Sequence, residues 1–448
     1  MSGRTTTDPR GGTRMRLRGL RATAAIAVLA LLAAACTGGG DEGDDGDGGN
    51  GPVTITVLDY YGEATPFSED VIARFEDENP GIKVTYEAGD WDSMHEKFTV
   101  QVSSGDSPDV ATMDMTWVPT FASKQIFADL TELSGGELGG EPIEDQYEQG
   151  ALEAMTFDDH YVTMMFDFDA YGLYYRADRF KAKGIDVPTT WEELQAAAKQ
   201  LAEDNDGDGQ CDQYCFVVEG NDCFHWCELL FQAGGEILND DHTAAAFNSS
   251  AGLSALEFYK SFLDDGSGIY WGEAQGEKIR GIKDGRIGMF VDGPYYMGVM
   301  KDGDPEGKGD WGVAAVPYAQ EPGSYLGGTG LSIPVNAPHP EEAWTFVEYM
   351  LQPEQQIGVF TLAGAAPATT AALQSSELTK PDPYFGDEAP FSIFLDSMAT
   401  ATHFPYVEQW DPIDTDIGNM VQSVMLGKAT PQEALDTYEA KVNEKLAG

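Results

Sequence analysis

Acidic and aromatic side chains stand close together at several separate places along the chain. They are Asp59 with Tyr60 and Tyr61, Trp91 after Asp90, Asp114 with Trp117, Asp167 and Asp169 with Tyr171, Asp292 with Tyr295, and Trp410 beside Asp411. A carboxylate accepts strong hydrogen bonds from hydroxyl groups, and an aromatic ring offers rigid apolar area to a face made of C–H groups. Such pairs suit a polyhydroxylated molecule with a polar rim and apolar faces.

A second group of oxygen ligands has the spacing of a calcium-binding loop. The candidate ligands, at loop positions 1, 3, 5, 7 and 9, are Asp204, Asp206, Asp208, Gln210 through its backbone carbonyl, and Asp212. Gly209 occupies position 6, where such loops turn sharply. Position 12 is Cys215, where these loops carry a bidentate glutamate. The pattern predicts a structural Ca²⁺ site, and its alternative is an acidic turn without an ion.

Four cysteines lie close together in the same region, and one more lies near the N-terminus. The four are Cys211, Cys215, Cys223 and Cys227. An even number of cysteines in an exported chain predicts two disulfides. Three pairings are possible, and the mirrored spacing favours the nested one, Cys211–Cys227 with Cys215–Cys223. A zinc site is the alternative, although the usual C-x2-C spacing is absent.

The N-terminal segment has the composition of an export signal. Arginines at 14, 16, 18 and 21 precede a small, apolar run over 22–35, which is too short to span a bilayer. The run ends at Cys36 and resembles a bacterial lipobox, so residues 1–35 are predicted to be a signal peptide, with Met15 as a possible start. Cys36 is the predicted lipidation site, and an ordinary secreted protein is the alternative. Residues 36–52 continue as a glycine-rich acidic tether, which has no apolar residue with which to fold.

The charge balance and the missing motifs exclude several classes of function. The formal net charge is −50, so the surface repels nucleic acid phosphates. His95-Glu96 lacks the second histidine of a zinc protease motif, and no G-x-S-x-G is present. Gly327 to Gly330 lacks the lysine and the following helix of a phosphate loop. The sequence therefore gives little support to an enzyme, and no cofactor beyond the structural Ca²⁺ is expected.

The hydrophobic periodicity predicts an α/β protein. Residues 53–57, 82–86 and 110–113 are predicted strands, and helices are predicted over 67–75 and 94–102 between them. This alternation indicates crossover units and mostly parallel sheets. Thr190 with Glu193 predicts a capping box at a later helix. Thr430 with Pro431 predicts the cap and first residue of the last helix.

Several motifs occur together in an order that is similar to one known family. They are Ser107–Trp117 followed by Ile126–Leu130, Gly172–Phe180 followed by Val187–Leu194, Gly288–Tyr295 followed by Trp311–Pro317, Gly327–Ile333 before the helix at 340–353, and Gly427–Leu435. In this order and spacing they resemble the extracellular solute-binding protein family 1, the maltose-binding-like receptors. The resemblance covers about residues 53–446.

The resemblance implies a fold, a function and partners. The expected fold is two α/β lobes joined by three hinge crossings, lobe 1 at 53–167 plus 315–363 and lobe 2 at 168–314 plus 364–448. The implied function is that of a receptor that binds a mono- or oligosaccharide between the lobes and delivers it to the permease subunits of an ABC importer. We expect a monomer outside the cytoplasm, held at the membrane only through lipidated Cys36, with no nucleic acid partner.

The resemblance also gives roles to candidate ligand-binding residues. The predicted set is Tyr60, Tyr61, Trp91, Asp114, Trp117, Asp167, Asp169, Tyr171, Gln232, Asp292, Tyr295, Thr329 and Trp410. Asp114 and Asp169 match acidic binding positions of the family, and Tyr295 matches its stacking ring. Alternatives are a strand end for the tyrosine pair, a helix cap for Trp91, helix core for Gln232 and a turn cap for Asp292.

Two other ligand classes and one enzyme class remain as alternatives. Tyrosine pairs such as Tyr60-Tyr61, Tyr174-Tyr175 and Tyr295-Tyr296 could bind ferric iron through their phenolate oxygens. Acids and rings could also bind a polyamine through charge and cation–π contacts. An extracellular glycoside hydrolase is the alternative from another class.

Overall fold

The computed structural model describes residues 51–61, 66–220, 223–272 and 275–447. The predicted signal peptide, Cys36 and nearly all of the tether lie outside these residues. The account below concerns the unit Gly51–Gly448. None of the described helices is both long and apolar enough to cross a membrane.

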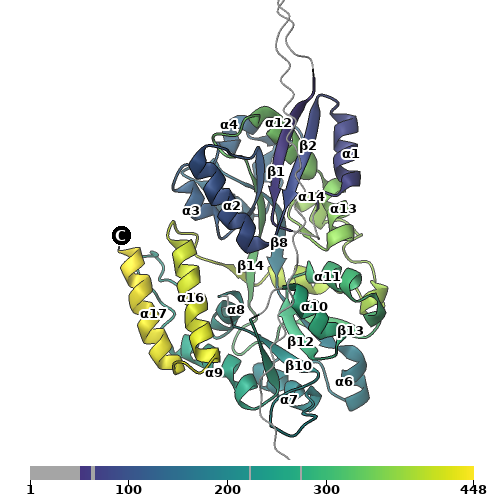
Figure 1. Ribbon diagram of the computed structural model, residues 1–448, viewed down its shortest axis with the longest axis vertical. Coiled ribbons are helices and arrows are strands. Elements are labelled where there is room, and N and C mark those ends of the chain that lie inside the picture. The colour runs from purple at the N-terminus through teal and green to yellow at the C-terminus, as the bar shows by residue number, and fades with distance from the viewer. Residues whose placement is uncertain (1–50, 62–65, 221–222, 273–274, 448) are drawn as a thin grey trace, which may run out of the picture. The chain divides into compact units, whose positions relative to one another are not determined.

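Two larger sheets organise this unit, and Figure 1 shows their strands in two groups. The first sheet has seven strands, β1 (Val53–Asp59), β2 (Ile82–Ala88), β3 (Val110–Asp114), β8 (Met164–Ala170), β14 (Ser324–Ser332), β15 (Ala366–Pro367) and β16 (Ala401–His403). The second has five, β9 (Gly172–Arg176), β10 (Cys215–Glu219), β11 (Gly268–Trp271), β12 (Ile287–Asp292) and β13 (Trp311–Ala315). Two short hairpins complete the strands, β4 (Glu137–Leu138) with β5 (Glu141–Pro142) and β6 (Thr156–Phe157) with β7 (His160–Tyr161).

Helices occupy most of the connections between the strands. Those that follow strands of the first half are α1 (Glu69–Glu78), α2 (Trp91–Ser104), α3 (Val118–Ala122), α4 (Leu130–Ser134), α5 (Gln149–Met155), α6 (Ala177–Lys183), α7 (Trp191–Leu201) and α8 (Phe224–Gln232). The later ones are α9 (Ser250–Asp264), α10 (Gln275–Lys283), α11 (Tyr296–Gly303), α12 (Pro340–Met350), α13 (Pro353–Ala363), α14 (Thr370–Leu373), α15 (Phe391–Met398), α16 (Trp410–Met425) and α17 (Pro431–Leu446). The last two helices lie side by side, drawn in yellow in Figure 1.

The crossover strands are parallel, as the sequence predicts, and the strands around the crossing points are antiparallel. β1 pairs in parallel with β2 and β3, and β10 pairs in parallel with β11 and β12. β8 and β9 are consecutive strands in different sheets, and so are β13 and β14. At these points the chain passes from one sheet to the other without a returning helix. β14 is therefore antiparallel to both β3 and β8, and β9 is antiparallel to both β12 and β13.

Alternating side chains give each sheet its core. In β1 the alternation of apolar and threonine residues buries Ile55 and Val57 in a cluster around the first sheet. In β12, Met289 and Phe290 point to opposite faces of the second sheet and join two different core clusters. The second sheet is thus covered on both faces, as expected for an α/β fold.

Of the two helix caps predicted from the sequence, one is found as predicted and the other differs. Thr430 and Glu433 form the capping box of α17, with Pro431 in its first turn. At α7 the Thr190 side chain accepts from the Glu193 backbone, but the Glu193 carboxylate accepts from Thr189 instead of Thr190. The full capping box predicted at Thr190 is therefore wrong, because the carboxylate reaches one residue further back.

Candidate functional site

Strand register brings three of the predicted residues side by side in the first sheet. Thr329 of β14 pairs with Asp114 of β3 on one side and with Asp167 of β8 on the other. Neighbouring strands lie about 4.8 Å apart, so the two carboxylates flank the threonine. Asp169 lies two residues further along β8 and therefore projects on the same side of the strand as Asp167. Asp114 is the last residue of β3, and Asp59 is the last residue of the neighbouring β1.

The two tyrosines after β1 bond to this row of side chains. The Tyr61 hydroxyl donates to Asp167 Oδ2, and its oxygen lies 2.8 Å from Thr329 Oγ1. The Tyr60 hydroxyl lies 2.6 Å from the same threonine oxygen. The two rings are stacked with their centroids 5.2 Å apart. The other Asp167 oxygen accepts from the Thr329 backbone N–H at 2.8 Å, so this carboxylate is held by neutral donors.

Asp114 is bonded to one tryptophan, and that tryptophan packs on another. The Trp91 indole N–H donates to Asp114 Oδ2 at 3.0 Å, and its ring lies 4.7 Å from the ring of Trp117. Trp117 also contacts Tyr60 edge-on at 5.3 Å. Trp91 is the first residue of α2, and the cap of that helix is Asp90, so the helix-cap alternative for Trp91 is wrong. The rings of Tyr60, Trp91 and Trp117 therefore form a continuous aromatic group beside Asp114.

The second sheet contributes another acid at its own strand end. Asp292, the last residue of β12, accepts from Lys278 Nζ of α10 at 2.8 Å and from the Gly293 backbone N–H at 2.9 Å. Lys278 also pairs with Glu219, the last residue of β10. Tyr295 is hydrogen-bonded to Asp292 through its side chain. Lys278 is buried, and its charge is balanced by two carboxylates.

Asp169 connects the acids of the two sheets. A side chain added at Gly293 would lie 1.9 Å from Asp169 Oδ1, so this carboxylate touches the turn after β12. Glycine at 293 is required here by close approach, since any β-carbon would displace the acid. The residues drawn together by the fold are thus the two tyrosines, the two tryptophans, Thr329, Tyr295 and the four aspartates 114, 167, 169 and 292. We call this group the acid–ring cluster.

Burial and mutual repulsion change the titration of these acids. Burial raises the pKa of Asp167 to about 7, against the lowering effect of its bonds from Tyr61 and Thr329. Burial also raises the pKa of Asp169 well above its usual range, and the charges of Asp167, Asp292 and Asp114 raise it further. The pKa of Asp114 is raised by burial too. The charges of three neighbouring acids therefore oppose the ionisation of Asp169 in this desolvated region.

Three predicted residues lie apart from the acid–ring cluster. Gln232 is fully buried, and its amide bonds to Trp191, Glu228 and the Gly323 carbonyl, so it has the helix-core role considered as its alternative. Trp410 is fully buried in the core of the second sheet, with its ring 4.9 Å from that of Phe404. Tyr171 joins β8 to β9 and packs on His225 and Tyr325.

The sequence reasoning missed Lys278, Glu219 and a second buried acid, Glu228. Lys278 sits in an ordinary amphipathic helix, and no local signal marks its partners 59 residues upstream and 14 downstream.

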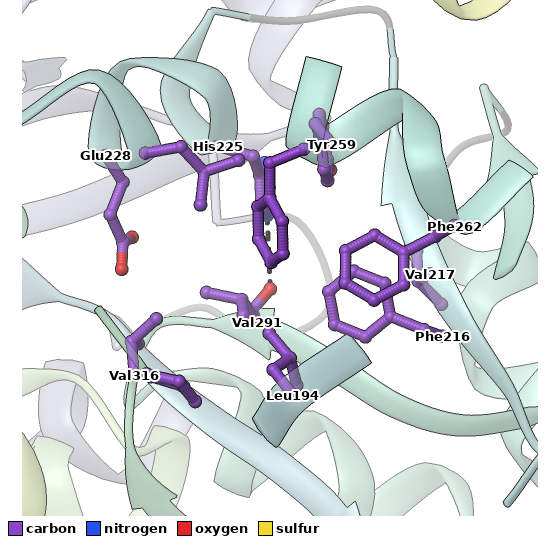
Figure 2. Close-up of a pocket in the computed structure, with 12 residues that line it drawn as sticks. Leu194, Phe216, Val217, His225, Glu228, Tyr259, Phe262, Val291 and Val316 are labelled. Carbon is purple, nitrogen blue, oxygen red and sulfur yellow. Dashed lines mark hydrogen bonds between the residues drawn. The ribbon is translucent and has the colours of Figure 1, made fainter. Parts of the chain in front are cut away.

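Glu228 of α8 lines a cavity of about 20 Å³ together with His225, Tyr259 and apolar side chains of α7, α9 and β12, shown in Figure 2. His225 Nε2 lies 3.1 Å from the Val291 carbonyl, the dashed line in that figure. Burial raises the pKa of Glu228 to about 8.

The acidic loop brings together three of its four predicted carboxylate ligands. Carboxylate oxygens of Asp204, Asp206 and Asp208 lie within 4.8 Å of one another, and all three residues are exposed. The Asp204 carboxylate accepts from the backbone of Gly207 and Gly209, which closes the loop. Asp212 instead accepts from the Asn205 backbone N–H at 2.8 Å. The three grouped acids fit a hard cation such as Ca²⁺, which prefers oxygen ligands.

The cysteine pairing differs from the prediction. The structure joins Cys211 to Cys215, so the nested pairing and the four-cysteine zinc site are both wrong. Cys223 and Cys227 are buried one helical turn apart at the start of α8. A turn in the chain brings Cys211 and Cys215 together before α8 begins. The spacing of the cysteines in the sequence does not predict that turn.

Comparison with known proteins agrees with this arrangement. The family described as bacterial extracellular solute-binding protein matches residues 61–357. A binding protein of Brucella abortus (strain 2308) is 28% identical over 410 residues, covering 88% of this chain and 93% of that protein. The diacetylchitobiose binding protein DasA of Streptomyces coelicolor is 25% identical over 404 residues, covering 88% and 90%.

Solved structures share the whole described fold. An ABC transporter solute-binding protein from Thermotoga lettingae, bound with α-D-tagatose, is 27% identical with a TM-score of 0.78, covering 88% of this chain and 100% of that one. The GacH receptor of Streptomyces glaucescens has a TM-score of 0.77 at 22% identity, covering 88% and 99%. The chain belongs to the bacterial extracellular solute-binding protein family, and its fold is the two-lobed α/β fold of the maltose-binding-like receptors.

Proposed function

We propose that this chain is the extracytoplasmic receptor of an ABC importer and that it binds a carbohydrate at the acid–ring cluster. The observation that carries the proposal is the meeting of acids from both sheets, Asp114 and Asp167 from one and Asp292 from the other, beside a continuous aromatic group. Carboxylates can accept from the hydroxyl rim of a sugar while rings cover its C–H faces. Relatives that bind diacetylchitobiose and tagatose support the same ligand class.

Hinge closure would couple binding to transport. The chain passes between the sheets at Tyr171 and again between β13 and β14, so ligand contacts at the cluster involve strands from both sides of these crossings. A ligand shifts an open–closed equilibrium only through contacts made better in one state. A sugar that touches Asp114 on one side and Tyr295 on the other would favour the closed state, which the permease would then recognise. The predicted lobe boundaries near 167, 314 and 363 remain part of this proposal.

Ferric iron is the alternative ligand for the tyrosines. Burial raises the pKa of Tyr60, Tyr61 and Tyr295 well above the usual value, so these phenols are neutral when no metal ion is bound. Tyr174, from another of the candidate pairs, is buried with its ring stacked on Phe290 and donates to the Gly293 carbonyl. The phenolic groups are therefore poised as neutral donors.

A thermal-shift screen with mono-, di- and oligosaccharides tests the proposal. A ligand present at 100 times its Kd stabilises the protein by about 2.7 kcal/mol, which is a measurable rise in Tm. We expect a rise with at least one carbohydrate, and weaker binding in Asp114→Ala and Tyr295→Ala without loss of folding. Asp240→Ala, at an exposed position in a loop of its own, is the matched control. Unchanged affinity in both site variants would remove the cluster as the binding site.

The same preparation separates a receptor from a glycoside hydrolase. A receptor returns the oligosaccharide intact after prolonged incubation, whereas a hydrolase releases shorter products. We propose that this chain has no catalytic activity. Chromatography of labelled oligosaccharides after incubation distinguishes the two classes. Shorter products that the wild type releases and Asp114→Ala does not would contradict the proposal.

We further propose that the mature protein is a monomeric lipoprotein whose Cys36 carries the anchor and whose acidic tether keeps the receptor near the membrane. More than one acyl chain gives stable anchoring, since each buried methylene contributes about 0.8 kcal/mol. Labelled fatty acid should enter the wild-type chain and not Cys36→Ser. Incorporation into both would show another site of attachment.

We also propose a structural Ca²⁺ ion at the acidic loop. Asp204, Asp206 and Asp208 would supply side-chain oxygens and Gln210 a backbone carbonyl. The ion's role there is to hold the loop by offsetting the repulsion of three adjacent carboxylates. Equilibrium dialysis near millimolar Ca²⁺ should show one bound ion, lost in Asp206→Ala. No uptake at that concentration would contradict the site.

A further inference from the structure

The acid–ring cluster offers far more hydrogen-bond acceptors than donors. Asp167 and Asp114 each have two oxygens, and among the described residues these acids accept from the neutral donors Tyr61, Thr329, Trp91 and Thr116. A carboxylate oxygen pair has about four acceptor positions, and ionised it donates nothing. A bound molecule that brings donors is therefore favoured over one that brings equal numbers of donors and acceptors.

The cationic side chain next to the cluster is already balanced. Lys278 pairs with Asp292 and with Glu219, which gives this trio one net negative charge. Throughout the described residues, no ion pair involves Asp114, Asp167 or Asp169. The His95 ring is tilted against the ring of Trp117, with centroids 4.7 Å apart, and its Nε2 lies 3.4 Å from Asp411 Oδ2. Among the described residues, the only cation that pairs with an acid of the cluster is thus Lys278, and its charge is already balanced.

One carboxylate oxygen is left without a partner at the place where the two sheets meet. Asp169 Oδ1 is buried and has no hydrogen-bond partner in the described part of the chain. It touches Gly293 on the side of the second sheet and lies on the same face of β8 as Asp167. A buried, unbonded carboxylate oxygen is costly unless a ligand satisfies it. The charges of Asp167 and Asp292 both act on Asp169, so a cation beside Asp169 has two further acids nearby.

The aromatic group favours the same type of ligand. Tyr60, Tyr61, Trp91 and Trp117 lie in one chain of ring contacts with centroids 4.7 to 5.3 Å apart. Aromatic faces attract cations, tryptophan most strongly. Rings and acids together can hold an ammonium group and the sugar ring that carries it.

We infer that the ligand of the acid–ring cluster is a carbohydrate bearing a free amino group, with the ammonium bound between Asp167, Asp169 and Asp292. This inference rests on the proposed function, because it names the substrate class for the same site. An ammonium brings three donors and no acceptor, and its bonds to carboxylates are the charge-assisted kind. A neutral sugar of the same size brings no positive charge to these acids.

Matched ligands that differ at a single position test the inference. Isothermal titration near neutral pH compares 2-amino-2-deoxy sugars with the parent 2-hydroxy and N-acetyl forms, as monosaccharides and as β-1,4-linked disaccharides, and includes spermidine as a polyamine. We expect at least one amino form to bind at least about tenfold more tightly than both its neutral partners, which corresponds to about 1.4 kcal/mol. The N-acetyl form is the decisive control, because it keeps the nitrogen and loses the charge.

Two variants assign the preference to this site. Asp169→Asn keeps the size of the side chain and removes its charge, so it should weaken binding of the amino form at least about tenfold more than binding of its neutral partners. Asp240→Asn, an exposed acid in a separate loop, should leave every affinity unchanged. A uniform loss for all ligands in Asp169→Asn would point to a structural role for the acid and would overturn the inference.

The outcomes separate this inference from the proposed function. Equal or tighter binding of neutral sugars overturns the amine inference and leaves the carbohydrate receptor standing. Binding of spermidine with no response to any sugar overturns both the carbohydrate proposal and the amino-sugar inference. In that case the cluster is a cation-binding site only. No binding by any of these ligands overturns both.

Discussion

Replacing Glu228 with glutamine should make the protein more stable at high pH and should flatten the pH dependence of its stability. Glu228 is 1% exposed. Its Oε1 accepts from Gln232 at 3.2 Å, and its Oε2 has no hydrogen-bond partner among the described residues. The surrounding cavity is lined mostly by apolar side chains (Figure 2). An ionised carboxylate is strongly disfavoured in such surroundings.

The magnitude follows from the difference between the folded and unfolded pKa. Burial raises the pKa of Glu228 from 4.5 to about 8, and only the nearby His225 opposes this effect. Between these values the folded protein keeps a proton that the unfolded chain has lost, so the free energy of unfolding falls as pH rises. Each pH unit costs about 1.4 kcal/mol, which gives a total of at most about 5 kcal/mol by pH 8. Glutamine at 228 never ionises and can still accept from Gln232.

Guanidinium unfolding followed by tryptophan fluorescence at unit steps from pH 5 to pH 9 measures this effect. Wild type and Glu228→Gln should differ little at pH 5, and the variant should gain several kcal/mol over wild type by pH 9. Glu257→Gln, an exposed position on α9, is the control and should follow wild type throughout. If the difference between Glu228→Gln and wild type is the same at pH 5 and pH 9, the burial argument for this acid is refuted.

Two further predictions concern the turn after β12 and the disulfide. Gly293→Ala should weaken ligand binding at least about tenfold, because the added β-carbon would lie 1.9 Å from Asp169 Oδ1 and must displace that acid. Titration calorimetry measures the affinity. Unchanged affinity would place Asp169 outside the site. Cys211→Ser should lower the free energy of unfolding by about 2 kcal/mol, as expected for so short a loop, and peptide mapping of the oxidised wild-type protein should recover Cys211 linked to Cys215. A recovered Cys211–Cys227 link would restore the nested pairing.

The sequence by itself determined most of what depends on neighbouring residues. The strands at 53–57, 82–86 and 110–113 and the helices between them are confirmed, because alternating and helical periodicities act over a few residues. The cap of α17 at Thr430 is confirmed for the same reason. The ordered motifs predicted the family and the two-lobed fold, which the comparisons confirm. Acids and rings at strand ends were also visible, since each pair is local.

Only the tertiary structure decided which of these residues meet. The Tyr61 and Thr329 hydroxyls bond across 268 residues, and that contact depends on the register of β14 between β3 and β8. Gln232 and Trp410 are buried in core contacts, although both were predicted to bind the ligand. Lys278 compensates the charges of Glu219 and Asp292, whereas no cation among the described residues pairs with Asp169. This difference depends on how α10 and β8 approach β12. Register and helix docking set the charge balance of the site, and neither is encoded within any short stretch of the chain.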